Sequence, residues 1–251
     1  SNKSNQKILV LESELITGNA LKQDRVVDRT TLIPENTTIM LQVSCCEKNR
    51  WSPVIANNIS VSDTLFFSKG RLDNSIEIYE KSKTDQFKIW DNISERLNDF
   101  KIKSFTGSTE EIYQKRKKDI EDLLLSFKPK FNSLGVAIAI GNQIISIDIF
   151  GDSNIFIIYF PRILRSVIID SYTKKPYQNF ICKENVYKLL RQFEKSQKKL
   201  HKSSGGCLGE EIKFNNNQVV GSCLQYSDIM IHFSGFLKDN SDIPHYKSEV
   251  A

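Results

Sequence analysis

Four carboxylates at the ends of predicted strands are the residues best suited to chemistry. A carboxylate held beside a ligand can act as a general base or bind a divalent ion. The four candidate catalytic residues are Glu47, Asp148, Glu210 and Glu211. The last two follow glycines at 205, 206 and 209, which would let the backbone approach a ligand closely. The alternative for this segment is a flexible turn that leads into a strand.

Asp148 has the most unusual setting of the four, because it lies inside the apolar run 144–150. Strand alternation places Asp148 on one face with Ile144 and Ser146, and the other isoleucines of the run on the opposite face. If the Asp148 face meets a cleft, the carboxylate would serve as a base or a ligand. If it meets solvent, Asp148 is an ordinary exposed strand residue.

Three arginines, Arg25, Arg50 and Arg71, are candidates for binding phosphate, because a guanidinium presents forked donors that match phosphate oxygens. The alternative for each is a surface salt bridge. Arg50 is the best placed, since it comes just after a predicted buried strand, where loops hold polar groups at a cleft. The two tryptophans, Trp51 and Trp90, would either stack on a base or fill the core.

Other kinds of site have less support in the sequence. Cys45 beside His232 would be a nucleophile, although a buried structural cysteine is the commoner role. The histidines and cysteines have no metal-ligand spacing, so no metal site is predicted. The glycine-rich segment 205–209 lacks the Lys-Ser/Thr ending of a phosphate-binding loop. No cofactor is identified from these patterns.

Composition narrows the class of protein. The chain has 251 residues and a net charge of +5, and its apolar run 155–160 is far shorter than the roughly 20 residues that cross a bilayer. Segment 183–202 has seven basic and two acidic residues, which accounts for the whole excess of +5. A charge confined to one predicted helix does not indicate nucleic acid, but it predicts a docking surface for a protein partner. Five sparse cysteines are typical of a reduced, cytoplasmic protein.

Apolar runs separated by turn residues predict an antiparallel sheet built from hairpins. Val26–Ile33 and Thr37–Val43 flank Pro34 and predict one hairpin, and Gly135–Ile140 with Ile144–Phe150 predicts the clearest one. Three further strands are predicted near the end of the chain, at Glu210–Phe214, Gln218–Leu224 and Ile229–Phe236.

Helical spacing of apolar residues predicts helices between these strands. They lie at Gln86–Phe100, from the capping residues Ser108 and Glu111 to near Pro129, from Asp152 through a kink or restart at Pro161, and at Glu184–Lys199. Residues 57–74 are polar and predicted as a loop with some strand. The fold class is therefore α+β, a mainly antiparallel sheet with three to five inserted helices.

Polar motifs occur in a characteristic order along nearly the whole chain. They are the segments 8–15, 23–25, 43–51, 135–139, 148–151 and 208–211, with Arg71, Trp90, Gly221 and His232 between or after them. In this pattern the chain resembles the ARPP family, the ADP-ribosylglycohydrolase- and rhodanese/phosphatase-associated protein domain. The Val-Ser-Cys-x-Glu-x-x-Arg-Trp stretch at 43–51 is the most specific part of the resemblance.

The resemblance implies one domain across 1–251, with a polar tail from 238 and a start inside the domain, because family members have residues before the first strand. It implies a phosphorylated NAD- or ADP-ribose-derived nucleotide as ligand. Glu14, Gln23 and His232 join the ligand-binding candidates on this basis. Two departures stand out: Ser13 replaces a usual glycine, and Asn19–Leu21 lengthens the next loop. The alternative function is a non-catalytic protein-interaction domain.

Overall fold

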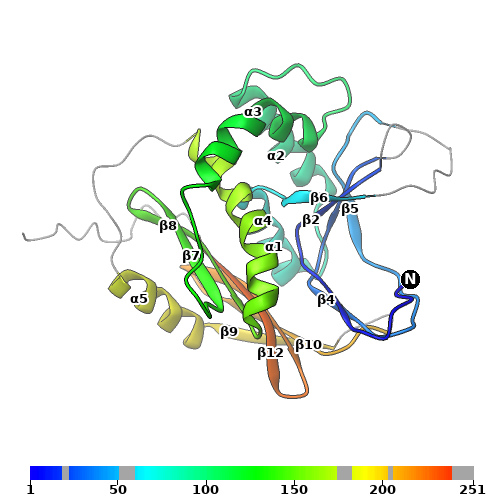
Figure 1. Ribbon diagram of the computed structural model, residues 1–251, viewed down its shortest axis with the longest axis vertical. Coiled ribbons are helices and arrows are strands. Elements are labelled where there is room, and N and C mark those ends of the chain that lie inside the picture. Colours follow the sequence, from blue (N-terminus) through cyan, green and yellow to red (C-terminus); the bar gives the residue numbers. More distant parts are fainter. Residues whose placement is uncertain (19–22, 51–59, 174–182, 203–205, 239–251) are drawn as a thin grey trace, which may run out of the picture.

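The computed structural model describes residues 1–18, 23–50, 60–173, 183–202 and 206–238. These ranges form antiparallel sheets and five helices, so the α+β prediction is confirmed (Figure 1). The largest sheet has six strands in the order β7-β8-β12-β11-β10-β9. Their bounds are Gly135–Ile140 (β7), Gln143–Phe150 (β8), Gln197–Lys202 (β9), Glu210–Asn215 (β10), Val219–Tyr226 (β11) and Ile229–Leu237 (β12).

Two smaller sheets form the N-terminal part. One has four strands in the order β5-β3-β2-β6, with bounds Glu14–Thr17 (β2), Arg25–Val27 (β3), Val43–Cys45 (β5) and Ser60–Leu65 (β6). The other pairs Ile8–Val10 (β1) with Thr31–Ile33 (β4). The hairpin predicted from 26–33 and 37–43 is confirmed at its open end, where Val27 of β3 pairs with Val43 of β5. It is wrong next to the turn, where β4 pairs with β1 instead.

The helices are Ser68–Lys81 (α1), Gln86–Asp99 (α2), Thr109–Leu124 (α3), Ser153–Ser171 (α4) and Lys183–Glu194 (α5). Helix α5 packs on one face of the six-stranded sheet through Leu189 and Phe193, whereas α1 and α4 cover the other face (Figure 1). Alternate residues of β11 show this division: Val220 contacts α1, and Cys223 belongs to the cluster under α5.

Helix α1 is the element that the sequence pattern missed, since 57–74 was predicted as a loop. Its buried residues include Arg71, Asn74 and Glu77, so its inward face has no apolar stripe to recognise. Its first turn also has no local cap. Instead, the backbone N–H of Lys69 donates to Asp170 of α4 over 3.1 Å.

The helix N-caps that the sequence predicts are confirmed. Ser108 caps α3 by accepting a hydrogen bond from the Glu110 N–H, and Asp152 caps α4. The return bond of the predicted capping box is replaced, because Glu111 accepts from Ser104 instead. Helix α4 continues through Pro161 without restarting there.

The predicted basic helix 184–199 is wrong at its C-terminal end. Helix α5 ends at Glu194, and residues 197–202 form edge strand β9, paired with β10. Lys199 is exposed and contacts α1: its Nζ donates to the Tyr79 carbonyl over 3.1 Å and lies 4.0 Å from the Tyr79 ring centre. The basic segment is thus a helix and a strand, not one solvated helix face.

Ser13 adopts a left-handed backbone conformation, which fits the glycine that the family resemblance implies at this position. Its φ is +70°, in the left-handed region, while its N–H donates to Val27 and its carbonyl accepts from Phe66.

Replacing Ser13 with glycine is expected to raise the free energy of unfolding by up to about 1 kcal/mol, because relief of the left-handed strain exceeds the entropy that glycine adds to the unfolded chain. Urea unfolding would measure the change. The exposed Ser126, which has no positive φ, provides the control. Ser126→Gly should destabilise, and a loss of stability in Ser13→Gly would contradict the strain argument.

Candidate functional site

The predicted site residues separate into two groups in the structure. The first, which we call the buried charge cluster, comprises Glu12, Arg71, Asp148, Glu211, Lys213 and His232. The second, the strand-end cluster, comprises Gln23, Arg25, Cys45, Glu47, Arg50 and Trp90, around the end of β5. The candidate residues from the sequence are therefore divided between one enclosed group and one group at an exposed strand end.

The centre of the buried charge cluster is the ion pair between Arg71 of α1 and Asp148 of β8. Arg71 Nη2 lies 2.7 Å from Asp148 Oδ1, and Nη1 lies 3.4 Å from Oδ2. The two side chains are only 1% and 0% exposed. Burial by itself raises the pKa of Asp148, but Arg71 and His232 outweigh it and hold that pKa below its usual value. Asp148 is therefore a charged partner inside the fold and does not face solvent.

Cross-strand register brings the other polar groups of this cluster to the same face of the sheet. Asp148 lies opposite Ser234, Ser234 opposite Ser222, and Ser222 opposite Lys213. The carboxylate of Glu12 accepts from both serine hydroxyls. This face carries a row of buried polar side chains where a sheet interior is normally apolar.

The alternation prediction for β8 was right for Ser146 and wrong for Ile144. A register shift in the β7–β8 pairing follows Ile138, and Ile144 joins the apolar cluster of Ile147 under α5. Such an irregularity adds one residue to a strand and so reverses the faces beyond it.

His232 lies between Asp148 and a threonine hydroxyl. Its Nε2 is 3.3 Å from Asp148 Oδ1, and its Nδ1 is 3.4 Å from Thr30 Oγ1. Thr30 Oγ1 also accepts from the Glu12 N–H. His232 thus belongs to the buried charge cluster, and Cys45 to the strand-end cluster.

At the rim of the buried charge cluster, Glu211 accepts from Arg29 over 3.1 Å and lies 3.4 Å from Lys213 Nζ. Burial lowers the pKa of Lys213, although Glu211 opposes the shift. With Arg29 included, three basic side chains face the three carboxylates of the cluster. This balance of charge suits the cluster to joining α1 and the N-terminal strands to the sheet.

The strand-end cluster forms where β5 stops, and Glu47 is its centre. The side chain of Glu47 is 1% exposed; its Oε2 accepts from the Asp24 N–H over 2.8 Å, and its Oε1 lies 3.0 Å from Arg50 Nε. Gln23 donates to the Glu47 carbonyl over 3.1 Å. Register places Arg25 of β3 opposite Cys45 of β5. The Val-Ser-Cys-x-Glu-x-x-Arg stretch therefore acts as a local frame for Glu47.

Two groups in this cluster have raised pKa values. Burial, reinforced by the carboxylate of Asp24, raises the pKa of Glu47, while the Asp24 N–H and Arg50 oppose the shift. Burial also raises the pKa of the Cys45 thiol, so Cys45 is not an activated nucleophile. Glu47 is thus a buried carboxyl group of raised pKa, a property that general acids and bases share.

Cations and aromatic rings lie on the exposed side of the same cluster. Arg25 and Lys48 are exposed, and Lys48 Nζ lies 5.9 Å from the Trp90 ring centre. Phe87, 70% exposed, meets Trp90 edge-on with ring centres 5.7 Å apart. Such a surface offers phosphate and ring contacts together.

Three predicted site residues lie outside both groups. Glu14 is buried and accepts from Tyr159, Arg162 and the Leu11 N–H, which is a structural arrangement. Glu210 is exposed on β10, on the opposite side of the strand from Glu211. Trp51 lies outside the described residues.

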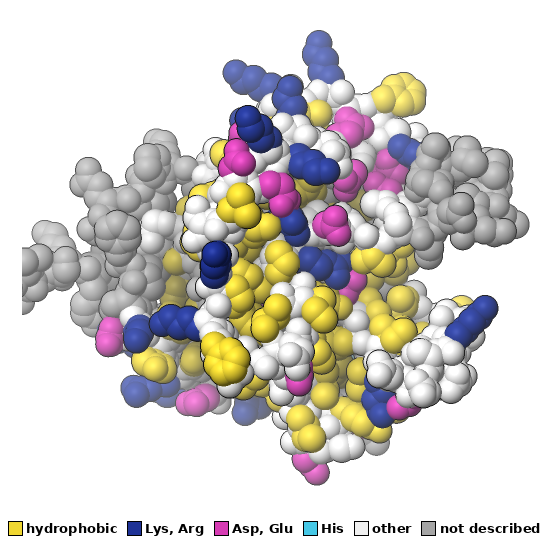
Figure 2. All heavy atoms as spheres, viewed as in Figure 1, with side chains coloured by type: hydrophobic (Ala, Val, Ile, Leu, Met, Phe, Trp, Pro, Cys, Tyr) yellow, Lys and Arg dark blue, Asp and Glu magenta, His cyan; other side chains and the backbone are white. Residues whose placement is uncertain are grey.

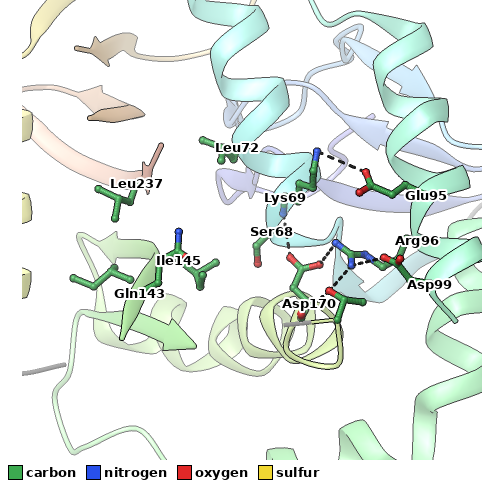
Figure 3. Close-up of a pocket in the computed structure, with 12 residues that line it drawn as sticks. Ser68, Lys69, Leu72, Glu95, Arg96, Asp99, Gln143, Ile145, Asp170 and Leu237 are labelled. Carbon is green, nitrogen blue, oxygen red and sulfur yellow. Dashed lines mark hydrogen bonds and ion pairs between the residues drawn. The ribbon is translucent and has the colours of Figure 1, made fainter. Parts of the chain in front are cut away.

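A separate pocket of about 250 Å³ contains residues that the sequence patterns did not select (Figure 3). One wall is apolar, with Leu72, Ile145 and Leu237; the other carries Lys69, Arg96, Asp170 and neighbouring charged groups. Arg96 Nη2 lies 2.8 Å from Asp170 Oδ1, and Nη1 lies 3.1 Å from Asp99 Oδ2. The charges of this wall are thus matched to one another. The i,i+3 spacing of Arg96 and Asp99 is the one signal visible in sequence.

Comparison with models of protein families shows which family the chain belongs to. Residues 1–236 match the model of ARPP-1, the ARG and Rhodanese-Phosphatase-superfamily-associated Protein domain. The chain belongs to the ARPP-1 family. Comparison with curated proteins and with solved structures returned no match.

The ARPP-1 match extends over both clusters and over the pocket except for Leu237. Within the described ranges of this ARPP-1 domain, no helix is long and apolar enough to cross a membrane. The same residues contain no group of three or more His, Cys, Asp or Glu side chains arranged to hold a metal ion.

Proposed function

We propose that this ARPP-1 domain binds a phosphorylated nucleotide related to ADP-ribose or NAD at the strand-end cluster. The observation that carries the proposal is the setting of Glu47, a buried carboxylate of raised pKa beneath exposed cations and an aromatic ring. The buried charge cluster is enclosed and internally neutralised, so it is the weaker candidate for a ligand site.

Arg25 and Lys48 would contact the phosphates. Arg25 presents an exposed guanidinium on β3, and a guanidinium matches two phosphate oxygens at once. Arg50 sits beside them, oriented by the Glu47 carboxylate. Three basic side chains around one strand end suit a diphosphate better than a single anion.

Trp90 would contact the base. It is half-buried at the start of α2, beside the exposed ring of Phe87. A planar base stacks on such a ring with little dependence on its identity. Phosphate and ring contacts in one place favour a nucleotide over a simple phosphorylated sugar.

Glu47 would provide the acid–base group if the bound compound is processed. A carboxyl group of raised pKa holds a proton closer to neutral pH than an ordinary glutamate does. Asp148, by contrast, has a lowered pKa and a fixed cationic partner, which suits it poorly to proton transfer.

Replacing Arg25 with glutamine is expected to weaken binding of ADP-ribose by about 10–100-fold, because one charge-assisted contact to phosphate is lost. Isothermal titration calorimetry with ADP-ribose, NAD and adenosine, with and without magnesium, would measure this. Adenosine lacks the phosphates, so its affinity should change little.

Arg116→Gln, which changes another partly exposed arginine on α3, is the matched control and should leave the affinity unchanged. Trp90→Phe retains a ring and should retain most of the affinity, whereas Trp90→Ala should not. Absence of binding by all three compounds, or equal affinity in Arg25→Gln and the wild type, would reject the proposal.

A further inference from the structure

Strand β7 is an edge of the six-stranded sheet and carries no charge. Its sequence is Gly-Val-Ala-Ile-Ala-Ile, and it is the terminal strand in the sheet order. Soluble proteins normally protect such edges with charged residues, proline or a bulge that turns the strand away. The opposite edge, β9, follows that rule with Lys198 and Lys199. The register shift in the β7–β8 pairing comes after Ile138, so residues 135–138 form a regular edge without charge or proline.

The backbone of β7 has hydrogen-bonding groups directed out of the sheet. Phe150 N–H donates to the Leu134 carbonyl over 2.7 Å, which makes 134 and 150 a hydrogen-bonded pair. Hydrogen-bonded pairs alternate along an antiparallel ladder, so Val136 bonds to β8 whereas Gly135 and Ala137 direct their N–H and C=O groups outward. Ala137 is exposed and has the smallest side chain that keeps strand geometry, so another strand can approach it closely.

Apolar side chains continue from this edge onto α4, which packs against β7. Leu134, Ile157 and Ile158 are 46%, 50% and 65% exposed. Figure 2 shows hydrophobic side chains gathered over α4 and β7 on this face of the molecule. An apolar surface beside a strand edge that no described strand pairs with is typical of an interface.

We propose that β7 pairs antiparallel with β7 of a second copy of this chain, so that the two six-stranded sheets become continuous. A two-fold axis beside Ala137 gives antiparallel pairing automatically, with Ala137 opposite the Ala137 of the second copy. Uncharged residues then meet uncharged residues, and the lysines of β9 lie at the two far edges, where they do not repel each other. In the joined sheet of the dimer, both β7 edges are paired, and the two remaining edges are the lysine-bearing β9 strands. A third copy therefore has no uncharged edge of this sheet to pair with. This inference does not depend on the proposed ligand.

Sedimentation velocity over a range of concentrations tests the pairing. The wild type should approach twice the mass of one chain as concentration rises. Ala137→Lys should raise the dimer dissociation constant by about tenfold or more, because two like charges would face each other across the axis. Ala137→Pro should do the same by removing the outward N–H, which takes part in no bond within the sheet. Leu200→Lys, on exposed edge strand β9, should leave the mass unchanged.

Hydrogen exchange at the Ala137 amide provides a measurement that needs no variant. In the wild type this amide should exchange fast in dilute solution and slow down as the dimer forms. The pairing is overturned if the wild type stays monomeric into the millimolar range, or if the dimer persists in both Ala137 variants. It is equally overturned if the Ala137 amide exchanges at one rate at all concentrations.

Discussion

Replacing Arg71 with methionine is expected to destabilise the protein by about 3–5 kcal/mol at neutral pH, because the buried Asp148 carboxylate would lose the guanidinium that balances its charge. Methionine retains much of the side-chain volume of arginine. The loss of stability therefore measures mainly the loss of the Arg71 charge. Asp148 is wholly buried, and the ring of His232 lies 3.3 Å from its carboxylate. Urea unfolding would measure the free energy.

The loss in Arg71→Met should depend on pH in a defined direction. In the wild type the pKa of Asp148 is lowered on folding, so the pair contributes stability that is fully present above the unfolded pKa of about 3.8 and is lost as pH falls through the folded value. In the variant, burial favours the neutral carboxyl group instead. The difference in stability between wild type and variant should therefore shrink as pH falls toward the acid range.

The exposed ion pair between Lys7 and Glu35 is the matched control, because its N···O distance is also 2.7 Å. Lys7→Met should change the stability little, since solvent screens an exposed pair. Adding Asp148→Asn to Arg71→Met should restore part of the loss, because the uncompensated charge is then removed. Equal losses in Lys7→Met and Arg71→Met would contradict the argument.

Replacing Phe193 with alanine is expected to cost about 3–5 kcal/mol, which is the range for a large aromatic side chain removed from a core. Phe193 is 4% exposed and packs edge-on against Phe233 and Phe214, with ring centres 5.1 and 6.3 Å away. It lies over Gly221 and Gly235, which makes it the main attachment of α5 to the sheet.

The two glycines beneath Phe193 allow this packing to be tested by a double-mutant cycle. A Cβ at Gly235 would lie 2.6 Å from Phe193 Cζ, whereas one at Gly221 would lie 2.4 Å from the backbone oxygen of Ser234. Gly235→Ala should therefore be tolerated better once Phe193 is alanine.

Gly221→Ala should remain costly in the Phe193→Ala background, because its Cβ would lie 2.4 Å from the Ser234 backbone oxygen as well as 2.9 Å from Phe193 Cε1. Its coupling to Phe193 should therefore be smaller than that of Gly235→Ala. Thermal and urea unfolding of the single and double variants would measure both couplings. Equal coupling of the two glycines to Phe193 would show that the ring does not occupy the space over Gly235.

The elements that sequence patterns identified correctly share strong local signals. Helix α2 has regular apolar spacing, α3 and α4 have side-chain caps at Ser108 and Asp152, and β7–β8 has a short polar turn. Each of these signals acts between residues close in the chain, so one sequence is enough to read it.

Helix α1 and strand β9 lacked such signals. Helix α1 buries polar residues and is capped by Asp170, which follows it by about one hundred positions. In β9 the lysines continued a helical pattern, and pairing with β10 decided the strand. Tertiary contacts overrode local preference in both cases.

The sequence by itself determined the α+β class, the family, and a set of polar residues able to bind or react. It also determined that 43–51 is a special stretch, because Cys45, Glu47 and Arg50 form their contacts locally. Only the tertiary structure decided which residues meet. Arg71 and Asp148 are 77 positions apart, and Glu12 and Ser234 are 222 apart, so their pairing depends on sheet register that no local pattern contains. The same register separated Asp148 and His232 from Glu47, because one set lies on a covered sheet face and the other at an exposed strand end.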